Sequence, residues 1–258
     1  MNPRFQRLAL LTGSETLDAL ARARVIVFGL GGVGSWCAEA LVRSGVGHIS
    51  VVDSDTVCIT NINRQAQATS ATVGAFKAES LKARLLAINP ACEVNAFTTV
   101  FSAESAASFA IECADYVIDA IDSLIHKVTL IEYTCHAGVA LFSSMGMAQK
   151  LDPTRIKTAD IWETQGCPLA RLVRAELRKR GFAGHFPAVY SDERLPLHRE
   201  IAVACGTGQC LCPAQGTEWC SSKKVINGSA VTVTATAGMI LAGLVLQDCY
   251  TRFNRAAL

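Results

Sequence analysis

The stretch VIVFGLGGVGSWCAEALVRSGVGHISVVD, residues 25–53, decides the fold of this chain. It opens with the β-branched run VIVF (25–28), and four glycines within six residues follow at once. A helical pattern continues from Ser35 to about Ser44, and a second apolar run, HISVVD, covers residues 48–53. Strand, glycine turn, helix and strand in this order form a βαβ unit, which requires two parallel strands in one sheet.

Short apolar runs continue to alternate with helical segments up to residue 146. Further strands are predicted over 93–100, 116–122 and 139–145, and further helices over 75–88 and 103–113. This pattern is typical of a Rossmann-like, doubly wound α/β fold with a mainly parallel sheet.

The character of the sequence changes after Gly146. A strongly basic helix is predicted over 170–181, residues 182–220 are rich in loops, and residues 225–250 return to core composition. Because no Ser- or Pro-rich linker separates these parts, we predict a single domain over residues 1–258. Its first half, 1–146, contains the glycine turn, and its elaborated second half, 147–258, is expected to complete a mixed sheet.

The composition excludes a disordered chain. Half of the 258 residues are hydrophobic and 18% are charged, so the chain can bury a sizeable core. Lys and Arg exceed Asp and Glu by only two charges. A nucleic-acid partner would therefore need a local basic patch rather than an overall positive field.

The uncharged stretch over residues 225–247 raises the question of a membrane span. It contains Asn227, Ser229 and three threonines, and its strongly apolar part runs only from Met239 to Leu246. We therefore expect a buried strand or loop followed by a core helix, and no membrane. The opening MNPRFQRLALLTG lacks the unbroken apolar stretch of a secretion signal, so we predict a cytoplasmic protein.

Ten of the 11 cysteines fall into two groups. Scattered cysteines in apolar segments are expected to be buried, reduced thiols: Cys37, Cys58, Cys92, Cys113, Cys135 and Cys249. Four others crowd a turn-rich loop over 205–220: Cys205, Cys210, Cys212 and Cys220. The loop cysteines are compatible with a tetrahedral Zn²⁺ site, with disulfides or with free thiols.

The glycine turn predicts a nucleotide site. It comprises Gly29, Gly31, Gly32 and Gly34 between a strand and a helix, where backbone amides and the helix end favour a phosphate. Asp53 ends the next strand and can accept hydrogen bonds from a ribose diol. NAD, FAD, an S-adenosyl compound and ATP all fit these residues, and a turn needed only for packing is the alternative.

The residues after Asp53 favour a triphosphate with a metal ion. The segment DSDTVCITNINRQ (53–65) supplies a second acid, amides and an arginine: Asp55, Asn61, Asn63, Arg64 and Gln65. Lys77 falls near the start of the next helix, and Asp119 and Asp122 end a later strand. Arg and Lys can neutralise a phosphate chain and the charge that develops during transfer, and a strand-end Asp can hold Mg²⁺.

Four linked motifs resemble the ThiF/MoeB/HesA superfamily, the ATP-dependent relatives of ubiquitin-activating enzymes. They are GxGGVGS, DxDxVxxxNxNRQ, GxxK and DAID, and the resemblance runs from about residue 4 to residue 145. It implies adenylation of a carboxylate with ATP and Mg²⁺, release of pyrophosphate and a homodimer. Residues 1–146 are then the nucleotide-binding half, and residues 147–258 the half for substrate and dimer contacts.

The resemblance also implies a role for each matching residue. The backbone from Gly29 to Gly34 faces the nucleotide, and Asp53 holds the ribose. The phosphates contact Asn61, Arg64 and Lys77. Asp55 and Gln65 complete the nucleotide site, and Asp119 or preferably Asp122 organises Mg²⁺. Arg7 resembles an arginine that crosses the dimer interface into the partner's ATP site. The catalytic residues are then Arg64, Lys77 and Asp122.

The second half resembles the branch that acts on tRNA, the threonylcarbamoyladenosine dehydratases. The similar stretches are 152–181, 188–193 and 226–246. The resemblance implies that ATP activates the threonyl carboxylate of the modified nucleoside, which then cyclises with AMP as leaving group. The alternative is activation of the C-terminal glycine of a ubiquitin-like sulfur carrier, although the chain lacks the CxxC pairs that many such enzymes carry. An NAD-dependent oxidoreductase and a non-catalytic nucleotide-binding scaffold are further alternatives.

The basic helix fits a tRNA partner. Its cations are Arg171, Arg174, Arg178, Lys179 and Arg180, with a single acid, Glu176, among them. A concentrated positive patch of this kind suits a phosphate backbone, although a solvated helix face has the same composition. Cys167 is a candidate acyl acceptor, but intramolecular cyclisation does not require one.

Overall fold

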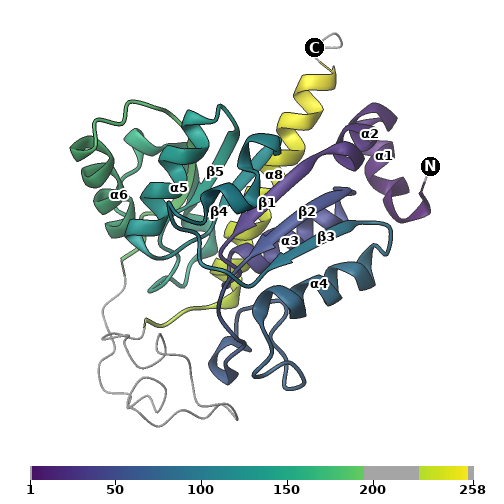
Figure 1. The fold of residues 1–258 in the computed structure, drawn as a ribbon, viewed down its shortest axis with the longest axis horizontal. Helices are drawn as coiled ribbons and strands as arrows, with labels where there is room; N and C mark the ends of the chain where they lie inside the picture. Colours follow the sequence, from purple (N-terminus) through teal and green to yellow (C-terminus); the bar gives the residue numbers. More distant parts are fainter. Residues whose placement is uncertain (1, 195–226, 255–258) are drawn as a thin grey trace.

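Within the residues that the computed structural model describes, 2–194 and 227–254, the chain forms one sheet of seven strands. The strands are β1 (Arg24–Phe28), β2 (His48–Val52), β3 (Glu93–Phe97), β4 (Tyr116–Asp119), β5 (Ala140–Ser144), β6 (Ile156–Asp160) and β7 (Pro187–Ser191). Their order is β3-β2-β1-β4-β5-β7-β6 (Figure 1). All neighbours are parallel except β6, which runs antiparallel to β7. The predicted mixed, mainly parallel sheet is confirmed.

Helices cover both faces of the sheet. They are α1 (Gln6–Thr12), α2 (Ser14–Arg22), α3 (Gly34–Arg43), α4 (Lys77–Ile88), α5 (Leu124–His136), α6 (Pro168–Lys179) and α8 (Val231–Asn254). Short 3-10 turns are η1 (Pro3–Phe5), η2 (Ile59–Asn61), η3 (Ala106–Phe109), η4 (Ile111–Cys113), η5 (Pro153–Arg155) and η6 (Ile161–Glu163). Helices α2, α3, α4 and α8 share one apolar core with the sheet, and α5 and α6 share the other.

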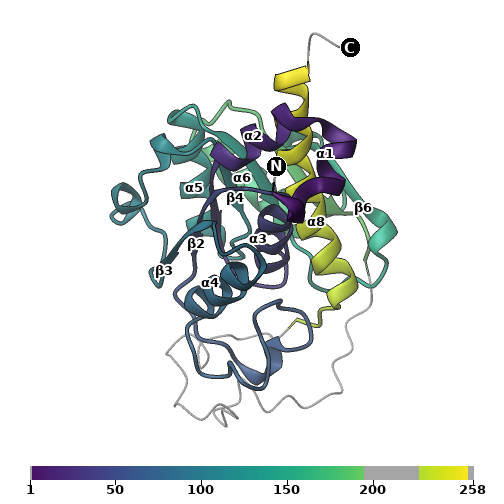
Figure 2. The same cartoon turned by 90° about the vertical axis from the view of Figure 1, so that its right-hand side faces the viewer.

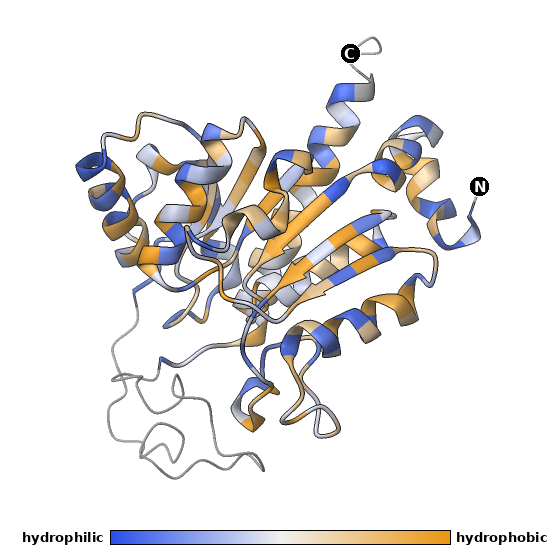
Figure 3. Cartoon of the chain, in the orientation of Figure 1, coloured by the Kyte–Doolittle hydropathy of each residue, from blue (hydrophilic) through white to orange (hydrophobic). Residues whose placement is uncertain are grey.

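Strand β1 explains why the sheet needs two covered faces. Val25 and Val27 belong to the core under α3 and α8, whereas Ile26 and Phe28 belong to the core under α5. Alternate side chains of a strand point to opposite faces, so an all-apolar strand must be buried on both sides. Figure 3 shows this strand as a hydrophobic band between the two helical layers.

The strand order creates a crevice at one edge of the sheet. From β1 the chain crosses to β2 on one side, and it later returns to β4 on the other side. In open α/β sheets, ligands bind outside the carboxyl ends of the strands where the order reverses. The loops after β1, β2 and β4 therefore converge on the expected binding edge.

The predicted helix over 103–113 is wrong. The segment forms two short turns, η3 and η4, joined by Ala110 with φ +46°. Phe109 and Ile111 are both buried in the same core, with Phe109 packed edge-on against Phe28 and Phe97. Residues two apart lie on nearly opposite sides of an α-helix, so a continuous helix could not bury both.

Several elements were not predicted. They are α1, α2, α5, β6 and β7. Strand β6 lies at the edge of the sheet and carries exposed polar residues, and β7 begins at a proline, so both resemble loop sequence. The segment from 182 to 194 is consequently not all loop. Helix α5 buries Lys127, which interrupts its apolar pattern.

The scattered cysteines are mostly buried thiols, as predicted. Cys37, Cys58, Cys92 and Cys249 are buried and free. Cys135 is only partly buried, and Cys113 is exposed, because it lies at the end of η4 on the outside of the turn. The cysteine cluster at Cys205, Cys210, Cys212 and Cys220, with its zinc alternative, lies outside the described residues.

The long C-terminal helix α8 packs into the core, as predicted. By length and composition it is the one helix in the described ranges that could cross a membrane. It contacts α3, α2 and β5, and Val233, Ala237, Leu241 and Val245 are fully buried or nearly so. Figure 2 shows α8 lying beside α3 on one face of the sheet.

Two glycines of α8 test this packing. We expect Gly238→Ala to lower the free energy of unfolding by about 1–3 kcal/mol, the range for overpacking a core. A Cβ at Gly238 would lie 2.5 Å from the carbonyl oxygen of Val33 and 2.9 Å from the amide nitrogen of Cys37. Urea denaturation followed by circular dichroism measures the change.

Gly243→Ala is the matched control on the same helix. Nothing lies within 4 Å of a Cβ at Gly243, so this change should be neutral or stabilise the protein by up to about 1 kcal/mol. Equal effects of the two substitutions would contradict the packing of α8 on α3.

Candidate functional site

The glycine turn after β1 is held in one conformation by close backbone contacts. Gly29 has φ +86°, and a Cβ there would lie 2.7 Å from the carbonyl oxygen of Ala120 after β4. A Cβ at Gly34 would overlap the carbonyl oxygen of Gly29. Gly31 differs, because nothing lies within 4 Å of its added Cβ. The turn therefore packs tightly on its inner side and leaves its backbone open at Gly31.

Asp53 fixes the turn to the end of β2. Its carboxylate accepts hydrogen bonds from the amide of Leu30 (2.7 Å) and from the amide of Asp55 (2.9 Å). Burial raises the pKa of Asp53, with a smaller contribution from Asp55, while Lys77 opposes the shift. The carboxylate therefore lies beside the open face of the turn, where a ribose diol can reach it.

Lys77, the first residue of α4, binds both acids of the segment. Its Nζ lies 2.7 Å from the Asp55 carboxylate and 3.8 Å from the Asp53 carboxylate. Burial lowers the pKa of Lys77, but Asp53 and Asp55 outweigh burial and hold this pKa above its ordinary value. Lys77 is therefore a buried ammonium, positively charged at neutral pH, beside the predicted phosphate position.

Arg64 packs against the glycine turn from the other side. Its Cγ lies 3.2 Å from the Cβ position of Gly32, and its Nη1 donates to the carbonyl of Thr60 and the side chain of Asn63. Trp36 on α3 donates to the Arg64 carbonyl at 3.0 Å. Burial lowers the pKa of Arg64, but a guanidinium remains charged in proteins.

The two acids after β4 have different environments. Asp122 is exposed, and its charge raises the pKa of both Arg64 and Lys77, so it faces the cations of the site. Asp119 is fully buried, 2.6 Å from Lys127 Nζ and hydrogen-bonded to Ser143. Asp119 therefore has no exposed surface for a ligand and instead anchors the loop that leads to Asp122.

Asn61 and Gln65 stabilise the loop that carries Arg64 through hydrogen bonds of their side chains. The Asn61 side chain accepts from the amide of Cys58, and the Gln65 side chain accepts from Gln67 at 3.4 Å. Both are buried and hold the loop that presents Arg64. Gln67 also donates to the carbonyl of Leu30, which ties this loop to the glycine turn.

Other contributors to the site were not singled out from the sequence. They are Ser35, Trp36, Gln67, Lys127 and Thr234. Ser35 donates to the Gly31 carbonyl and accepts from the Ala66 amide, and Thr234 on α8 lies 2.9 Å from the Cβ position of Gly32. Helix α8 therefore forms one wall of the turn. Only the GxGGVGS motif pointed to any of these residues, through Ser35.

Arg7 does not join the other predicted residues within one chain. It is exposed on α1, which precedes α2 and the amino end of β1. Figure 1 shows α1 and α2 beside the start of β1, opposite the edge that carries the glycine turn. A contribution of Arg7 to a partner's site stays a prediction.

The charges at this edge fit a phosphate chain accompanied by a metal ion. Two cations, Arg64 and Lys77, face three carboxylates, Asp53, Asp55 and Asp122. A triphosphate would add further negative charge, so a divalent cation is needed to balance it. No group of three or more metal-ligating side chains occurs in the described part of the chain, but Mg²⁺ bound to phosphates takes only one or two carboxylates. The exposed Asp122 fits this requirement.

The basic helix α6 is not a uniform positive patch. Arg178 lies over the ring of Trp162, and Arg180 forms ion pairs with Glu132 and Glu176. Lys179 lies 3.9 Å from Glu176. The cations at the carboxyl-terminal end therefore have acidic or aromatic partners, whereas Arg171 and Arg174 in the first half form no ion pair within the described residues. Cys167 is buried and is the N-cap residue of α6, at the end of the loop that follows η6.

Comparison with known proteins identifies similar chains. The model of the ThiF family matches residues 5–252. The tRNA threonylcarbamoyladenosine dehydratase of Bacillus subtilis is 40% identical over 245 residues, covering 95% of this chain and 93% of the relative. The structure of E. coli tRNA N6-threonylcarbamoyladenosine dehydratase, TcdA, in complex with ATP has a TM-score of 0.82 at 33% identity, covering 98% of this chain and 96% of that one. The sulfur carrier protein adenylyltransferase of Thermus thermophilus is 37% identical over 122 residues, 46% of this chain and 45% of the relative.

Two glycines of the turn allow its packing role and its proposed nucleotide-binding role to be tested separately. We expect Gly34→Ala to destabilise the protein by about 2 kcal/mol or more, because the new Cβ overlaps the Gly29 carbonyl. Gly31→Ala should leave stability within about 0.5 kcal/mol, since its Cβ enters open space. That space is where a phosphate would approach, so Gly31→Ala should remove most of the rise in melting temperature caused by ATP. Thermal denaturation with and without ATP measures both effects, and a full ATP shift in Gly31→Ala would contradict the assignment.

Proposed function

This chain belongs to the ThiF family, and we propose that it adenylates a carboxylate with ATP, acting on the threonyl carboxylate of threonylcarbamoyladenosine in tRNA. The observation that carries the proposal is similarity over nearly the whole length to the dehydratase of Bacillus subtilis, second half included. The structures of E. coli TcdA with ATP and with AMP support the nucleotide assignment.

The proposed reaction has two steps. A carboxylate oxygen of the substrate attacks the α-phosphorus of ATP, an acyl–adenylate bond forms, and pyrophosphate leaves. A nucleophile of the same modified nucleoside then attacks the activated acyl carbon and closes a ring. AMP leaves and carries away one oxygen of the original carboxylate. Adenylation supplies the leaving group, because a free carboxylate is a poor acyl donor.

The residues of the site divide this work. Asp53 holds the ribose diol, and the open backbone at Gly31 approaches the phosphates. Arg64 and Lys77 stabilise the charge that gathers on the departing pyrophosphate. In the structure Lys77 is bound to Asp55 at 2.7 Å, so it must exchange this partner for a phosphate oxygen when ATP binds.

Asp122 is the residue that we assign to Mg²⁺. Magnesium bound to ATP neutralises the phosphates and orients them for in-line attack. Asp122 lies after β4, exposed and facing Arg64 and Lys77, so its carboxylate can supply an oxygen ligand from the protein side. The buried pair of Asp119 and Lys127 keeps the preceding backbone in position.

A homodimer and a cytoplasmic location remain part of the proposal. The exposed Leu10 and Leu11 of α1 give the Arg7 helix an apolar surface for a second copy of the chain. Through such an interface Arg7 could reach the partner's nucleotide.

The second candidate function is adenylation of a sulfur-carrier protein. The Thermus thermophilus relative supports it, but that similarity covers only 46% of this chain. Both candidates use the same adenylation step, so they differ only in the carboxylate that the second half receives.

Pyrophosphate exchange tests the proposal. We expect tRNA carrying threonylcarbamoyladenosine to stimulate exchange between ATP and labelled pyrophosphate, and a carrier protein ending in Gly-Gly not to do so. Arg64→Ala should lower the rate by about 100-fold or more, as when one preorganised charge stabiliser is lost. Arg22→Ala, which removes an exposed arginine at the opposite end of β1, is the control and should keep full activity. Exchange stimulated only by the carrier protein would support the alternative, and exchange with neither would contradict both.

Asp122→Asn tests the metal assignment. We expect the variant to need roughly 10-fold more Mg²⁺, or more, for the ATP-dependent rise in melting temperature, a loss seen even when outer-shell partners of a metal are removed. Asp18→Asn on α2 is the control. An unchanged Mg²⁺ requirement would show that Asp122 is not the ligand of the metal ion.

A further inference from the structure

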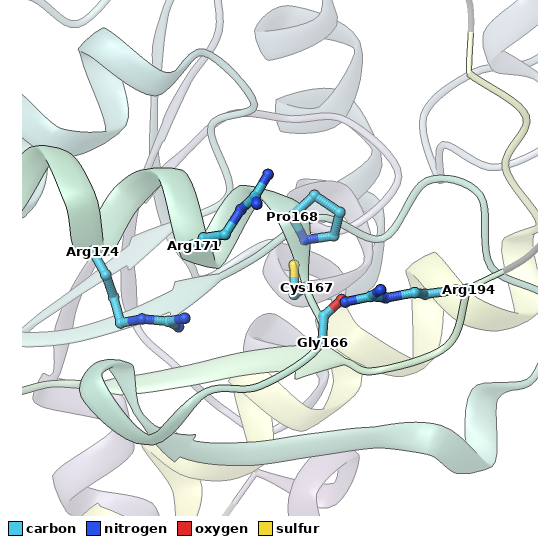
Figure 4. Close-up of a pocket in the computed structure, with 6 residues that line it drawn as sticks. All are labelled: Gly166, Cys167, Pro168, Arg171, Arg174 and Arg194. Carbon is cyan, nitrogen blue, oxygen red and sulfur yellow. The ribbon is translucent and has the colours of Figure 1, made fainter.

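A cavity of about 290 Å³ opens at the start of α6, away from the glycine turn. Its lining consists of Gly166, Cys167, Pro168, Arg171, Arg174 and Arg194. Figure 4 shows Arg174 and Arg194 extending toward Gly166 and Cys167 from opposite sides, with Arg171 one turn along the helix. The described residues that line this small space therefore include three arginines and no acid.

The cavity lies at the same edge of the sheet as the nucleotide site. Gly146 follows the carboxyl end of β5, and a Cβ there would lie 3.8 Å from Cys167 Sγ. Arg194 follows the carboxyl end of β7, which is parallel to β5. Since β1 lies two strands from β5, and strands are about 4.8 Å apart, the cavity and the glycine turn are roughly neighbouring sites on one edge.

Among the described residues, no acid pairs with the arginines of the cavity. Arg174 donates there to neutral acceptors, the hydroxyl of Thr164 and the carbonyl of Ile161. Arg194 donates to the carbonyl of Gly166 at 3.4 Å. The side chain of Arg171 is exposed and forms no hydrogen bond or ion pair with any residue in the ranges described. These arginines contrast with Arg178 and Arg180 on the same helix, which have aromatic or acidic partners.

An acid beside the cavity, Asp192, is already paired. Asp192 lies beside Gly166, but its carboxylate binds Arg155 at 2.9 Å and Lys157 at 2.6 Å. The amino end of α6 adds the positive end of a helix dipole to the same space. An anion that entered the cavity would therefore meet three guanidinium groups without displacing a carboxylate.

We propose that this cavity binds a backbone phosphate of the RNA strand that presents the carboxylate to ATP. The inference rests on the proposed function and extends it by assigning a substrate subsite. Guanidinium groups match the planar, bidentate geometry of phosphate oxygens. The volume is at the lower end of the range for small-ligand sites, about 300–1,000 Å³, which suits one phosphate and its sugar but not a duplex. The proposed function assigns the triphosphate of ATP to the glycine turn after β1, which leaves the cavity for a second anion.

The test compares arginines inside and outside the cavity in the full-length protein. Arg171→Ala and Arg194→Ala should each weaken binding of tRNA about fivefold at 0.1 M salt, and each should reduce the slope of log affinity against log salt by about 0.7. Lys179→Ala is the matched control, because it removes an exposed cation from the same helix outside the cavity. Filter binding between 50 and 200 mM salt measures affinity, and the ATP-dependent rise in melting temperature should be unchanged in all three variants.

Two further measurements identify the anion: tRNA binding with and without the modification, and the ATP-dependent rise in melting temperature. A tRNA transcript without the modification should lose as much affinity on Arg171→Ala as modified tRNA does, because a phosphate is present in both. A loss confined to modified tRNA would assign the cavity to the threonyl carboxylate, and a reduced ATP shift would assign it to the phosphates of ATP. Either result would overturn the proposal.

The proposal and the function on which it rests fail differently. If the wild-type protein shows tRNA-stimulated pyrophosphate exchange while Arg171→Ala and Arg194→Ala bind tRNA as Lys179→Ala does, the cavity assignment is wrong and the function stands. If the wild-type protein neither binds tRNA nor responds to it, both are wrong.

Discussion

The close approach of Gly34 to the carbonyl of Gly29 is the constraint on which both the fold and the site depend. Any side chain at position 34 would overlap that carbonyl, and one at position 29 would press on the backbone after β4. The contact brings the start of α3 against the end of β1, so the helix packs on the sheet and aims its amino end at the crevice. One steric requirement thereby fixes both the packing of α3 on β1 and the turn that we propose binds phosphate.

Around this turn the charged residues are arranged so that each holds another in position. Asp53 is fixed by the amides of Leu30 and Asp55, and Lys77 is held between the two acids. Replacing Lys77 would leave the partly buried carboxylates of Asp53 and Asp55 without their counter-charge, so its removal alone would not separate a role in folding from the proposed role toward phosphate. Substitutions at exposed positions report more clearly on ligand binding.

Local patterns in the sequence were sufficient for the first half of the site. The glycine spacing, the strand-end Asp53 and the segment to Lys77 are each local, and the structure brings Asp53, Asp55, Arg64 and Lys77 around one turn. The burial of Asp119 could not be predicted, because its partner Lys127 belongs to a helix whose pattern that lysine interrupts. The stacking of Arg178 on Trp162 and the ion pair of Arg180 with Glu132 were likewise hidden, since Trp162 and Glu132 come from other elements. Contacts between distant segments decide these features, and a single sequence does not report them.

The path of the chain between β5 and β7 has a consequence for how such an enzyme diversifies. The chain leaves β5, forms the antiparallel edge strand β6 and then α6, and returns to insert β7 between β5 and β6. This excursion contributes most of the arginine-lined cavity, which Arg194 after β7 completes, and the glycine turn with Asp53 and Lys77 lies outside it. Under the proposed function, a change of residues in the excursion would therefore alter how the substrate is held and leave the residues around the nucleotide unchanged. The two parts are joined through the hydrogen bonds from β1 to β4 and from β4 to β5.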